Sequence, residues 1–117
     1  MAKPYLNRLS VIITSLNIAT DEGVWLECKH FFSGAALYAN GKICASLTPA
    51  GVGLKLPMES RIRLIEEGDG KELRYFDKAP VKKEYVALLQ TVVDDPDRLK
   101  TLLLQSIEYV ADRVGVA

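Results

Sequence analysis

The dipeptide Asn40-Gly41 constrains the fold of this chain more than any other local feature. A two-residue type I′ turn needs positive φ at both central positions, and Asn-Gly tolerates that backbone best. Because residues 37–39 and 42–44 on either side have strand character, the dipeptide predicts a β-hairpin. Its second strand is expected to end near Thr48-Pro49. Residues 52–56 are expected to return as another strand, which gives an antiparallel meander.

The stretch from Leu26 to Ala39 also has a strand pattern, but the pattern leaves the number of strands open. From Trp25 onward the side chains alternate with a period of two, which predicts an extended strand. The alternation places Leu26, Cys28, His30 and Phe32 on one side and Glu27, Lys29 and Phe31 on the other. Ser33-Gly34 interrupts it, and a glycine there indicates a bulge, a bend or a tight turn. The stretch is therefore either one bent strand or two strands.

Three helices are predicted from apolar residues that recur every three or four positions. The first covers about residues 4–17, the second about residues 58–67, and the third begins after Asp94-Asp95. Pro96 suits the first helical position, and Asp97 favours the positive end of the helix dipole. The apolar faces comprise Leu6, Leu9, Ile13 and Leu16 in the first helix, Met58, Ile62 and Ile65 in the second, and Leu99, Leu102, Leu103, Ile107, Val110 and Val114 in the third.

Two further strands, residues 72–77 and 81–91, are expected between the second and third helices. The run from Tyr85 to Leu89 is mostly apolar, which is typical of a well-buried strand. The predicted order is therefore helix, three or so strands, helix, two strands, helix. One core under a single sheet fits this order best.

Length and charge exclude several classes of protein. A chain of 117 residues fits one domain, and residues 1–117 are expected to form it. Fifteen basic and fifteen acidic side chains cancel, so the composition lacks the basic excess of a protein that grips nucleic acid by itself. Polar residues interrupt the N-terminal apolar run, unlike in a signal peptide. No segment approaches the roughly 20 apolar residues that cross a bilayer. These features predict a cytoplasmic protein.

The cysteine and histidine pattern indicates structure more than chemistry. Cys28 and Cys44 are interpreted as reduced, buried side chains, with a disulfide as the alternative. Cys28 and His30 would share a strand face, but a metal site needs three or four ligands and the chain has no second histidine. A Cys–His nucleophile pair would lack an orienting third group. The sequence thus predicts no catalytic residue, no metal site and no cofactor.

Two acidic clusters are interpreted as solvated helix ends and caps. The first comprises Glu66, Glu67, Asp69 and Glu72, and the second comprises Asp94, Asp95 and Asp97. Paired carboxylates can hold a hard cation or transfer protons, but acidic residues also favour helix N-termini without any function. The paired glycines at 51 and 53 and at 68 and 70 lack the remainder of a phosphate-binding motif, so they are interpreted as turns.

One basic run is a candidate for nucleic-acid contact. It comprises Arg74, Lys78, Lys82 and Lys83, with Tyr75, Phe76 and Tyr85 among them. Basic residues interleaved with aromatic residues can bind a single nucleic-acid strand. Lysines also protect an edge strand against aggregation. Because the chain is neutral overall, the edge-strand interpretation is favoured and nucleic-acid contact is the alternative.

Residues 31–45, FFSGAALYANGKICA, resemble the N-terminal domain of the competence regulator TfoX (Sxy). That family typically shows a Met-Phe-Gly-Gly-x-Gly-x-Tyr run, then an Asp/Asn-Gly turn and a strand. Residues 52–56 are similar to its Leu-Tyr-Leu-Lys strand. Tyr85 and residues 94–99 resemble its tyrosine and its entry to the last helix. The similarity runs from about Leu26 to Val110.

The resemblance implies an α+β fold of two layers, α-β(3)-α-β(2)-α, with a mainly antiparallel sheet. This fold is similar to that of secretion chaperones, in which homodimers are common. The resemblance also implies a link to transcriptional control of DNA uptake. The full-length regulators bear a C-terminal domain, and this chain is expected to be a stand-alone N-terminal domain. No catalytic or ligand residues come with the family.

The first hypothesis from these features is a non-enzymatic, homodimeric protein-interaction domain that acts in regulation. A nucleic-acid binder that uses Arg74, Lys78, Lys82 and Lys83 is the second. The third is a small-molecule binder or an undiscovered enzyme, with a pocket near Cys28 and His30.

Overall fold

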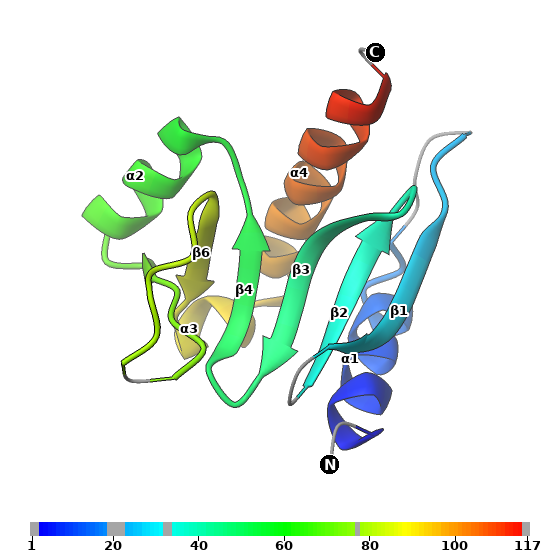
Figure 1. Cartoon of the computed structure of the whole chain (residues 1–117), viewed down its shortest axis with the longest axis horizontal. Coiled ribbons are helices and arrows are strands. Elements are labelled where there is room, and N and C mark those ends of the chain that lie inside the picture. Colours follow the sequence, from blue (N-terminus) through cyan, green and yellow to red (C-terminus); the bar gives the residue numbers. More distant parts are fainter. Residues whose placement is uncertain (1–2, 19–22, 32–33, 77, 116–117) are drawn as a thin grey trace.

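The computed structural model describes residues 3–18, 23–31, 34–76 and 78–115, with only the backbone of residues 3 and 112–115 (Figure 1). The elements in chain order are α1 (Lys3–Ser15), β1 (Leu26–Phe31), β2 (Gly34–Ala39), β3 (Lys42–Thr48), β4 (Gly51–Lys55), α2 (Met58–Glu66), β5 (Gly70–Glu72), β6 (Tyr85–Leu88), α3 (Gln90–Val93) and α4 (Pro96–Gly115). The predicted α+β class is confirmed. Four strands rather than three precede α2, and the short helix α3 precedes the last helix.

Six strands form one antiparallel sheet in the order β1-β2-β3-β4-β6-β5. Strands β1 and β5 are therefore its two edges. Helices α1 and α4 lie behind the sheet in Figure 1, and α2 lies beyond its β5 end. We call the side covered by α1 and α4 the helix face and the opposite side the outer face. None of the helices, over the part of the chain described, is long and apolar enough to cross a membrane.

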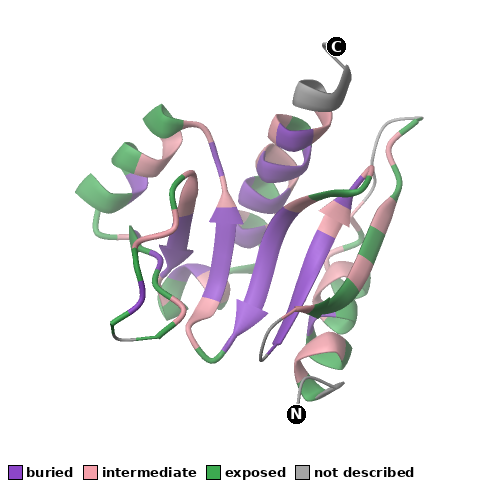
Figure 2. Cartoon of the chain, viewed as in Figure 1, coloured by how far each residue is buried: buried purple, intermediate pink, exposed green. Residues whose placement is uncertain are grey.

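The core lies between the helix face and helices α1 and α4. Leu37 of β2, Leu54 of β4 and Leu103 of α4 are almost completely buried there (Figure 2). Burying one such side chain stabilises the fold by about 1.5–3 kcal/mol relative to leaving it exposed. Leu9 anchors α1 in this core, and the other predicted apolar residues of α1 pack around it. The predicted apolar face of α1 is confirmed.

The predicted hairpin joins β2 to β3. Asn40 and Gly41 have φ of 51° and 81°, and Ala39 pairs with Lys42 across the turn. The Asn40 side chain also accepts a hydrogen bond of 3.0 Å from the Trp25 backbone N–H. In return, the Asn40 backbone N–H donates to the Trp25 carbonyl. The turn therefore also holds the start of β1.

Residues 26–39 form two strands, which settles the alternative that the sequence leaves open. Leu26 pairs with Ala39 and Phe31 pairs with Gly34, so β1 and β2 are a tight antiparallel hairpin. The alternation places Cys28 against the helix-face core, whereas Glu27 and Lys29 on the other side are exposed. Residues 32 and 33, which the prediction also covered, lie outside the described part of the chain.

A bulge in β3 is bridged by α4. Leu37 pairs with Ala45 but Tyr38 pairs with Ile43, so Cys44 is an extra residue in β3. The fully buried Ser106 hydroxyl of α4 lies 2.7 Å from the Cys44 carbonyl and 2.7 Å from the Lys55 carbonyl. A buried carbonyl that a bulge removes from the ladder needs such a partner.

The predicted strands at 72–77 and 81–91 are wrong in their extent. Strand β5 ends at Glu72 and β6 spans only Tyr85–Leu88, with residue 77 outside the described part. The Leu89 carbonyl accepts hydrogen bonds from the backbone N–H groups of Val92 and Val93, so residues 90–93 form α3. The well-buried strand predicted around residues 85–89 is confirmed in β6, where Val86, Ala87 and Leu88 are buried.

The start of α4 follows the prediction. The Asp95 side chain accepts a 3.2 Å hydrogen bond from the Arg98 backbone N–H, and Pro96 is the first helical residue. The Arg98 guanidinium lies 2.9 Å from Asp69 and 3.7 Å from Glu67. Members of both acidic clusters thus cap or tether this helix end. The predicted apolar residues of α4 from Leu99 to Val110 are buried, and the Val114 side chain lies outside the description.

Candidate functional site

The predicted basic run lies on the connection between β5 and β6, which crosses the outer face. Arg74, Lys78, Lys82 and Lys83 all lie outside the strands, so the edge-strand interpretation is wrong. The chain leaves β5 because Leu73, only 1% exposed, turns onto the sheet. The Lys82 backbone N–H donates to the Leu73 carbonyl at 2.9 Å, which closes the connection into a loop.

Small residues of the sheet make room for this connection. A Cβ atom on Gly53 would lie 2.7 Å from Cδ2 of Leu73 and 3.0 Å from Oγ of Ser46, so Leu73 occupies the space that glycine leaves. The Tyr75 hydroxyl donates to Ser46 Oγ at 3.5 Å. The Tyr75 ring centroid lies 5.7 Å from that of Phe31 in an edge-to-face arrangement. Residues 73–75 are thereby held against three strands.

Three tyrosine rings of the outer face each have a lysine ammonium within 6 Å of the ring centroid. The pairs are Tyr38–Lys29 at 5.1 Å, Tyr75–Lys82 at 5.7 Å and Tyr85–Lys55 at 5.8 Å. Such a contact contributes about 0.5–1 kcal/mol at an exposed site. Burial raises the pKa of Tyr75 and of Tyr85, so both phenols are protonated at neutral pH. Sequence reasoning missed Lys29 and Lys55 because only strand pairing brings them to this face.

The basic run is only partly brought together. Lys82 contacts Tyr75, and Arg74 donates from Nη1 to the Ala79 carbonyl at 2.6 Å. Lys78 and Lys83 are exposed. Because Lys82 covers a face of the Tyr75 ring, that ring face does not offer a base-stacking platform. Nucleic-acid contact through these residues stays a prediction.

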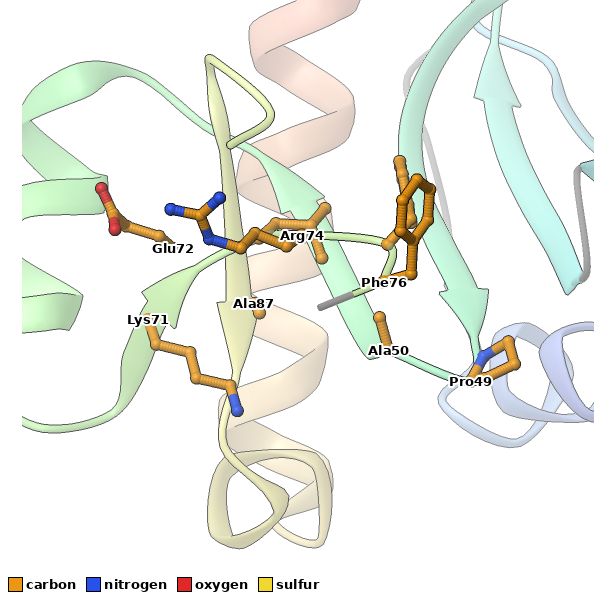
Figure 3. Close-up of a pocket in the computed structure, with 9 residues that line it drawn as sticks. Pro49, Ala50, Lys71, Glu72, Arg74, Phe76 and Ala87 are labelled. Atoms are coloured by element: carbon orange, nitrogen blue, oxygen red, sulfur yellow. The ribbon is translucent and has the colours of Figure 1, made fainter. Parts of the chain in front are cut away.

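A cavity of about 470 Å³ lies beside the connection (Figure 3). Its lining comprises Pro49, Ala50, Lys71, Glu72, Leu73, Arg74, Tyr75, Phe76 and Ala87. In Figure 3 the Lys71 side chain points away from those of Glu72 and Arg74. Ligand pockets typically converge a few polar groups on one point, and these charged groups do not converge. Its lining includes neither Cys28 nor His30, near which the third hypothesis placed a pocket.

The two thiols are free, as predicted, and Cys44 is buried, whereas Cys28 is only partly buried. Strand β2 separates β1 from β3, which places the backbones of Cys28 and Cys44 about 10 Å apart. A disulfide needs Cα atoms closer than about 7 Å. Burial raises the pKa of Cys28, against a smaller lowering by a hydrogen bond with Ser10. His30 is exposed, and among the described residues no three His, Cys, Asp or Glu side chains could hold a metal ion.

The buried thiol of Cys44 makes the stability of the protein depend on pH in the alkaline range. Burial raises the pKa of this thiol from 9.0 to about 12, and a hydrogen bond with Ser106 offsets only part of the effect. Above pH 9.0 the unfolded thiol loses its proton while the folded thiol keeps it, so the free energy of unfolding falls as pH rises toward 12. We therefore expect the stability difference between wild type and Cys44→Ala to shrink between neutral pH and about pH 10 in urea unfolding. Parallel pH profiles would contradict this origin of the dependence.

The second helix presents apolar side chains to solvent. Met58, Ile62 and Ile65 are 62%, 47% and 43% exposed, and we call these three residues the α2 stripe. The sequence predicted these residues as the apolar face of the helix, and in the structure this face is exposed to solvent. Leu64 is the residue of α2 that is buried. At 100° per residue, Leu64 points about a third of a turn away from the stripe.

Polar anchors fix α2 in this rotation. The Arg61 guanidinium donates from Nε to the Leu56 carbonyl at 2.9 Å. The Gln105 amide of α4 donates to the Ser60 hydroxyl at 2.8 Å. Ser60, Arg61 and Leu64 together form the side of α2 that packs against the rest of the protein. Apolar periodicity identifies a face of a helix, but these contacts decide which face the sheet covers.

Comparison with known families places the chain. The model of the TfoX N-terminal domain family matches residues 24–110 of the 117. The match begins just before β1 and ends within α4, so it spans all six strands, α2 and α3. No curated protein matches the chain.

Proposed function

The chain belongs to the TfoX N-terminal domain family, and from this premise we propose that it is a non-enzymatic, cytoplasmic protein-interaction domain that acts in regulation as a homodimer. The observation that carries the proposal is the α2 stripe. Three large apolar side chains stand exposed on one helix whose seating is fixed by other residues. A contiguous apolar surface of this kind marks a contact with another protein.

The border of the α2 stripe indicates the chemistry of the partner. Glu59 and Glu66 are exposed and, by helical geometry, lie beside Ile62 along one side of the stripe. An amphipathic segment with apolar residues flanked by lysine or arginine would complement both the apolar surface and its acidic border. The stripe lies at the β5 end of the sheet, so the opposite edge stays available for a second copy of the chain (Figure 1).

The state of the polar side chains supports a non-enzymatic role. Burial holds the pKa of both thiols above the ordinary value, which keeps the reactive thiolate scarce at neutral pH. The Asp69 and Asp95 carboxylates bond to Arg98, where they tether α4. The Ser106 hydroxyl is committed to backbone carbonyls. These groups have structural partners in place of an activated nucleophile.

A photo-reactive side chain on α2 identifies the partner. Benzoylphenylalanine is introduced at Ile62, and at Arg63 as the control, in the full chain expressed in its own cells. We expect a discrete cross-linked protein from position 62 that position 63 yields weakly, since Arg63 points about a quarter of a turn away. Mass spectrometry then names the protein, which is purified for a binding measurement. Equal cross-linking from both positions would contradict a stripe-specific contact.

The affinity between the purified chain and its purified partner is then measured. We expect Ile62→Gln/Ile65→Gln to weaken the affinity about tenfold or more, because apolar anchors in an interface centre each contribute 1 kcal/mol or more. The matched control Arg63→Gln/Glu108→Gln carries the same two new side chains at exposed positions off the stripe and its acidic border, and it is expected to bind within about threefold of wild type. Circular dichroism checks that both variants fold. A stripe variant that binds like wild type would refute the proposed role of α2.

A further inference from the structure

The edge strand β1 has backbone groups that point away from the sheet. The Trp25 carbonyl accepts a hydrogen bond from Asn40, so the backbone of Trp25 faces the β2 side. Backbone direction alternates along an antiparallel strand, and Glu27, Lys29 and Phe31 therefore also face β2. The N–H and C=O groups of residues 26, 28 and 30 point outward from the edge. No described strand pairs with that side of β1.

Strand β1 lacks most of the usual protections of an edge, and its charged side chains are the exception. It is six residues long and carries no proline, and its pairing with β2 is regular over all six positions. By contrast, the other edge, β5, has only three residues and lies against α2. The charges on β1 are of opposite sign: Glu27 and Lys29 lie on the outer face with 3.6 Å between carboxylate and ammonium. A strand with both signs can attract a second copy of itself.

We propose that β1 pairs antiparallel with β1 of a second copy, in the register that sets Cys28 opposite Cys28 of the partner copy. This inference rests on the proposed homodimeric function and names its surface. The two six-stranded sheets would then become one continuous sheet with a two-fold axis at Cys28.

Charge selects this register. Residues that oppose each other across an antiparallel pair share one face, so one residue must lie opposite its own copy, with the two-fold axis midway between them. An axis at Glu27 would set the Glu27 carboxylates of the two copies opposite each other. An axis at Lys29 would do the same with the two Lys29 ammonium groups. An axis at Cys28 sets Glu27 opposite Lys29 of the partner copy, twice by symmetry. Opposite charges directly across a strand pair stabilise it, and like charges destabilise it.

The helix face leaves room for the second copy. Ser10 of α1 reaches Cys28 by a hydrogen bond, which places this side of α1 near β1. Ser10, Val11 and Thr14 line one shallow depression, and Val11 is 64% exposed. Small side chains there permit the two α1 helices to approach, and Val11 adds apolar area to the strand contact. The interface is small, so we expect a dissociation constant in the micromolar range.

Thiol cross-linking reports the register directly. In the proposed dimer the two Cys28 residues form a hydrogen-bonded pair with Cα atoms about 5.5 Å apart, within the range of a disulfide. The full chain is oxidised with copper phenanthroline and run on a non-reducing gel. The oxidant takes one electron from each thiol, both protons leave, and one S–S bond forms. We expect a covalent dimer from wild type and from Cys44→Ala, and none from Cys28→Ser.

A thiol far from β1 serves as the control for cross-linking by random collision. The variant Cys28→Ser/Glu66→Cys places an exposed thiol on α2, at the opposite end of the sheet. It is expected to cross-link at least about tenfold more slowly than wild type at the same concentration. Cross-linking through Cys28 no faster than through this control would overturn the proposed register.

A charge swap gives a second measurement that does not depend on thiol access. Lys29→Glu sets one carboxylate opposite Glu27 of the other copy, twice by symmetry, and we expect it to raise the dimer dissociation constant about tenfold or more. The swap Glu27→Lys/Lys29→Glu restores opposite charges and is expected to restore the dimer. Both residues are exposed, so the variants should fold. Light scattering across concentration gives the mass. An unchanged mass for Lys29→Glu would overturn the inference, whereas binding at the α2 stripe is measured independently of it.

Discussion

Replacing Gly34 with alanine is expected to lower the free energy of unfolding by about 3 kcal/mol or more. Its Cβ atom would lie 2.2 Å from the Leu47 carbonyl oxygen and 2.8 Å from Cα of Thr48. Both atoms belong to the backbone of β3, so no side-chain rotation can relieve the clash. Strand β2 would have to move away from β3 at the point where the β1–β2 hairpin begins.

The control is a glycine that is needed for its dihedral angle and not for space. Gly41 has φ of 81°, and nothing lies within 4 Å of the Cβ that alanine would add. Gly41→Ala should cost about 1–2 kcal/mol, the price of the left-handed backbone conformation. Urea unfolding followed by circular dichroism measures both variants. If Gly34→Ala proves no less stable than Gly41→Ala, the close packing of β2 on β3 is refuted.

The sequence is informative about Gly34 and Gly41 to different degrees. Asn40-Gly41 predicts its turn because the required φ angles are a local property of those two residues. The need for glycine at position 34 comes from β3, thirteen residues away along the chain at Leu47. Local pattern therefore reveals an interruption between β1 and β2, but only the strand pairing shows that the interruption is a hairpin.

The same distinction explains the exposure of the α2 stripe and the wrong strand extent around β5. The periodicity of Met58, Ile62 and Ile65 identifies a helix and one of its faces, yet hydrogen bonds from Arg61 and Gln105 rotate that face to solvent. Residues 73–76 have strand character, but the space above Gly53 draws Leu73 onto the outer face and ends β5. Both outcomes depend on partners that are distant in sequence.

The candidate interaction surfaces could also be predicted only in part from the sequence. The basic run was visible because its members are close together in sequence, and in the structure Lys82 contacts the Tyr75 ring whereas Lys78 and Lys83 are exposed. The α2 stripe was visible in the sequence as an apolar pattern, but the pattern does not tell whether the stripe is buried or exposed. The exposure of the stripe makes it a candidate for partner binding. This exposure becomes evident only from the structure, where the other side of the helix packs against the protein.

Truncating Leu73 should be the most costly change on the outer face. Leu73 is 1% exposed and lies outside the core cluster of the helix face. Leu73→Ala leaves a cavity over Gly53 and is expected to lower the free energy of unfolding by about 2–5 kcal/mol. Leu104→Ala, at a half-buried position of α4 outside that cluster, is the matched control and should cost clearly less. Equal costs would contradict the role of Leu73 as the anchor of the connection.

A second substitution tests whether Leu73 and Gly53 share one space. Gly53→Ala alone should destabilise the protein by about 1–3 kcal/mol, because the new methyl group would meet Leu73 Cδ2 at 2.7 Å and Ser46 Oγ at 3.0 Å. In Gly53→Ala/Leu73→Ala the methyl group enters the space that the leucine vacates. The double variant should therefore be more stable than the sum of the two single effects by about 1 kcal/mol or more. Strict additivity would mean that the two residues do not touch, and the connection would then have to lie elsewhere on the outer face.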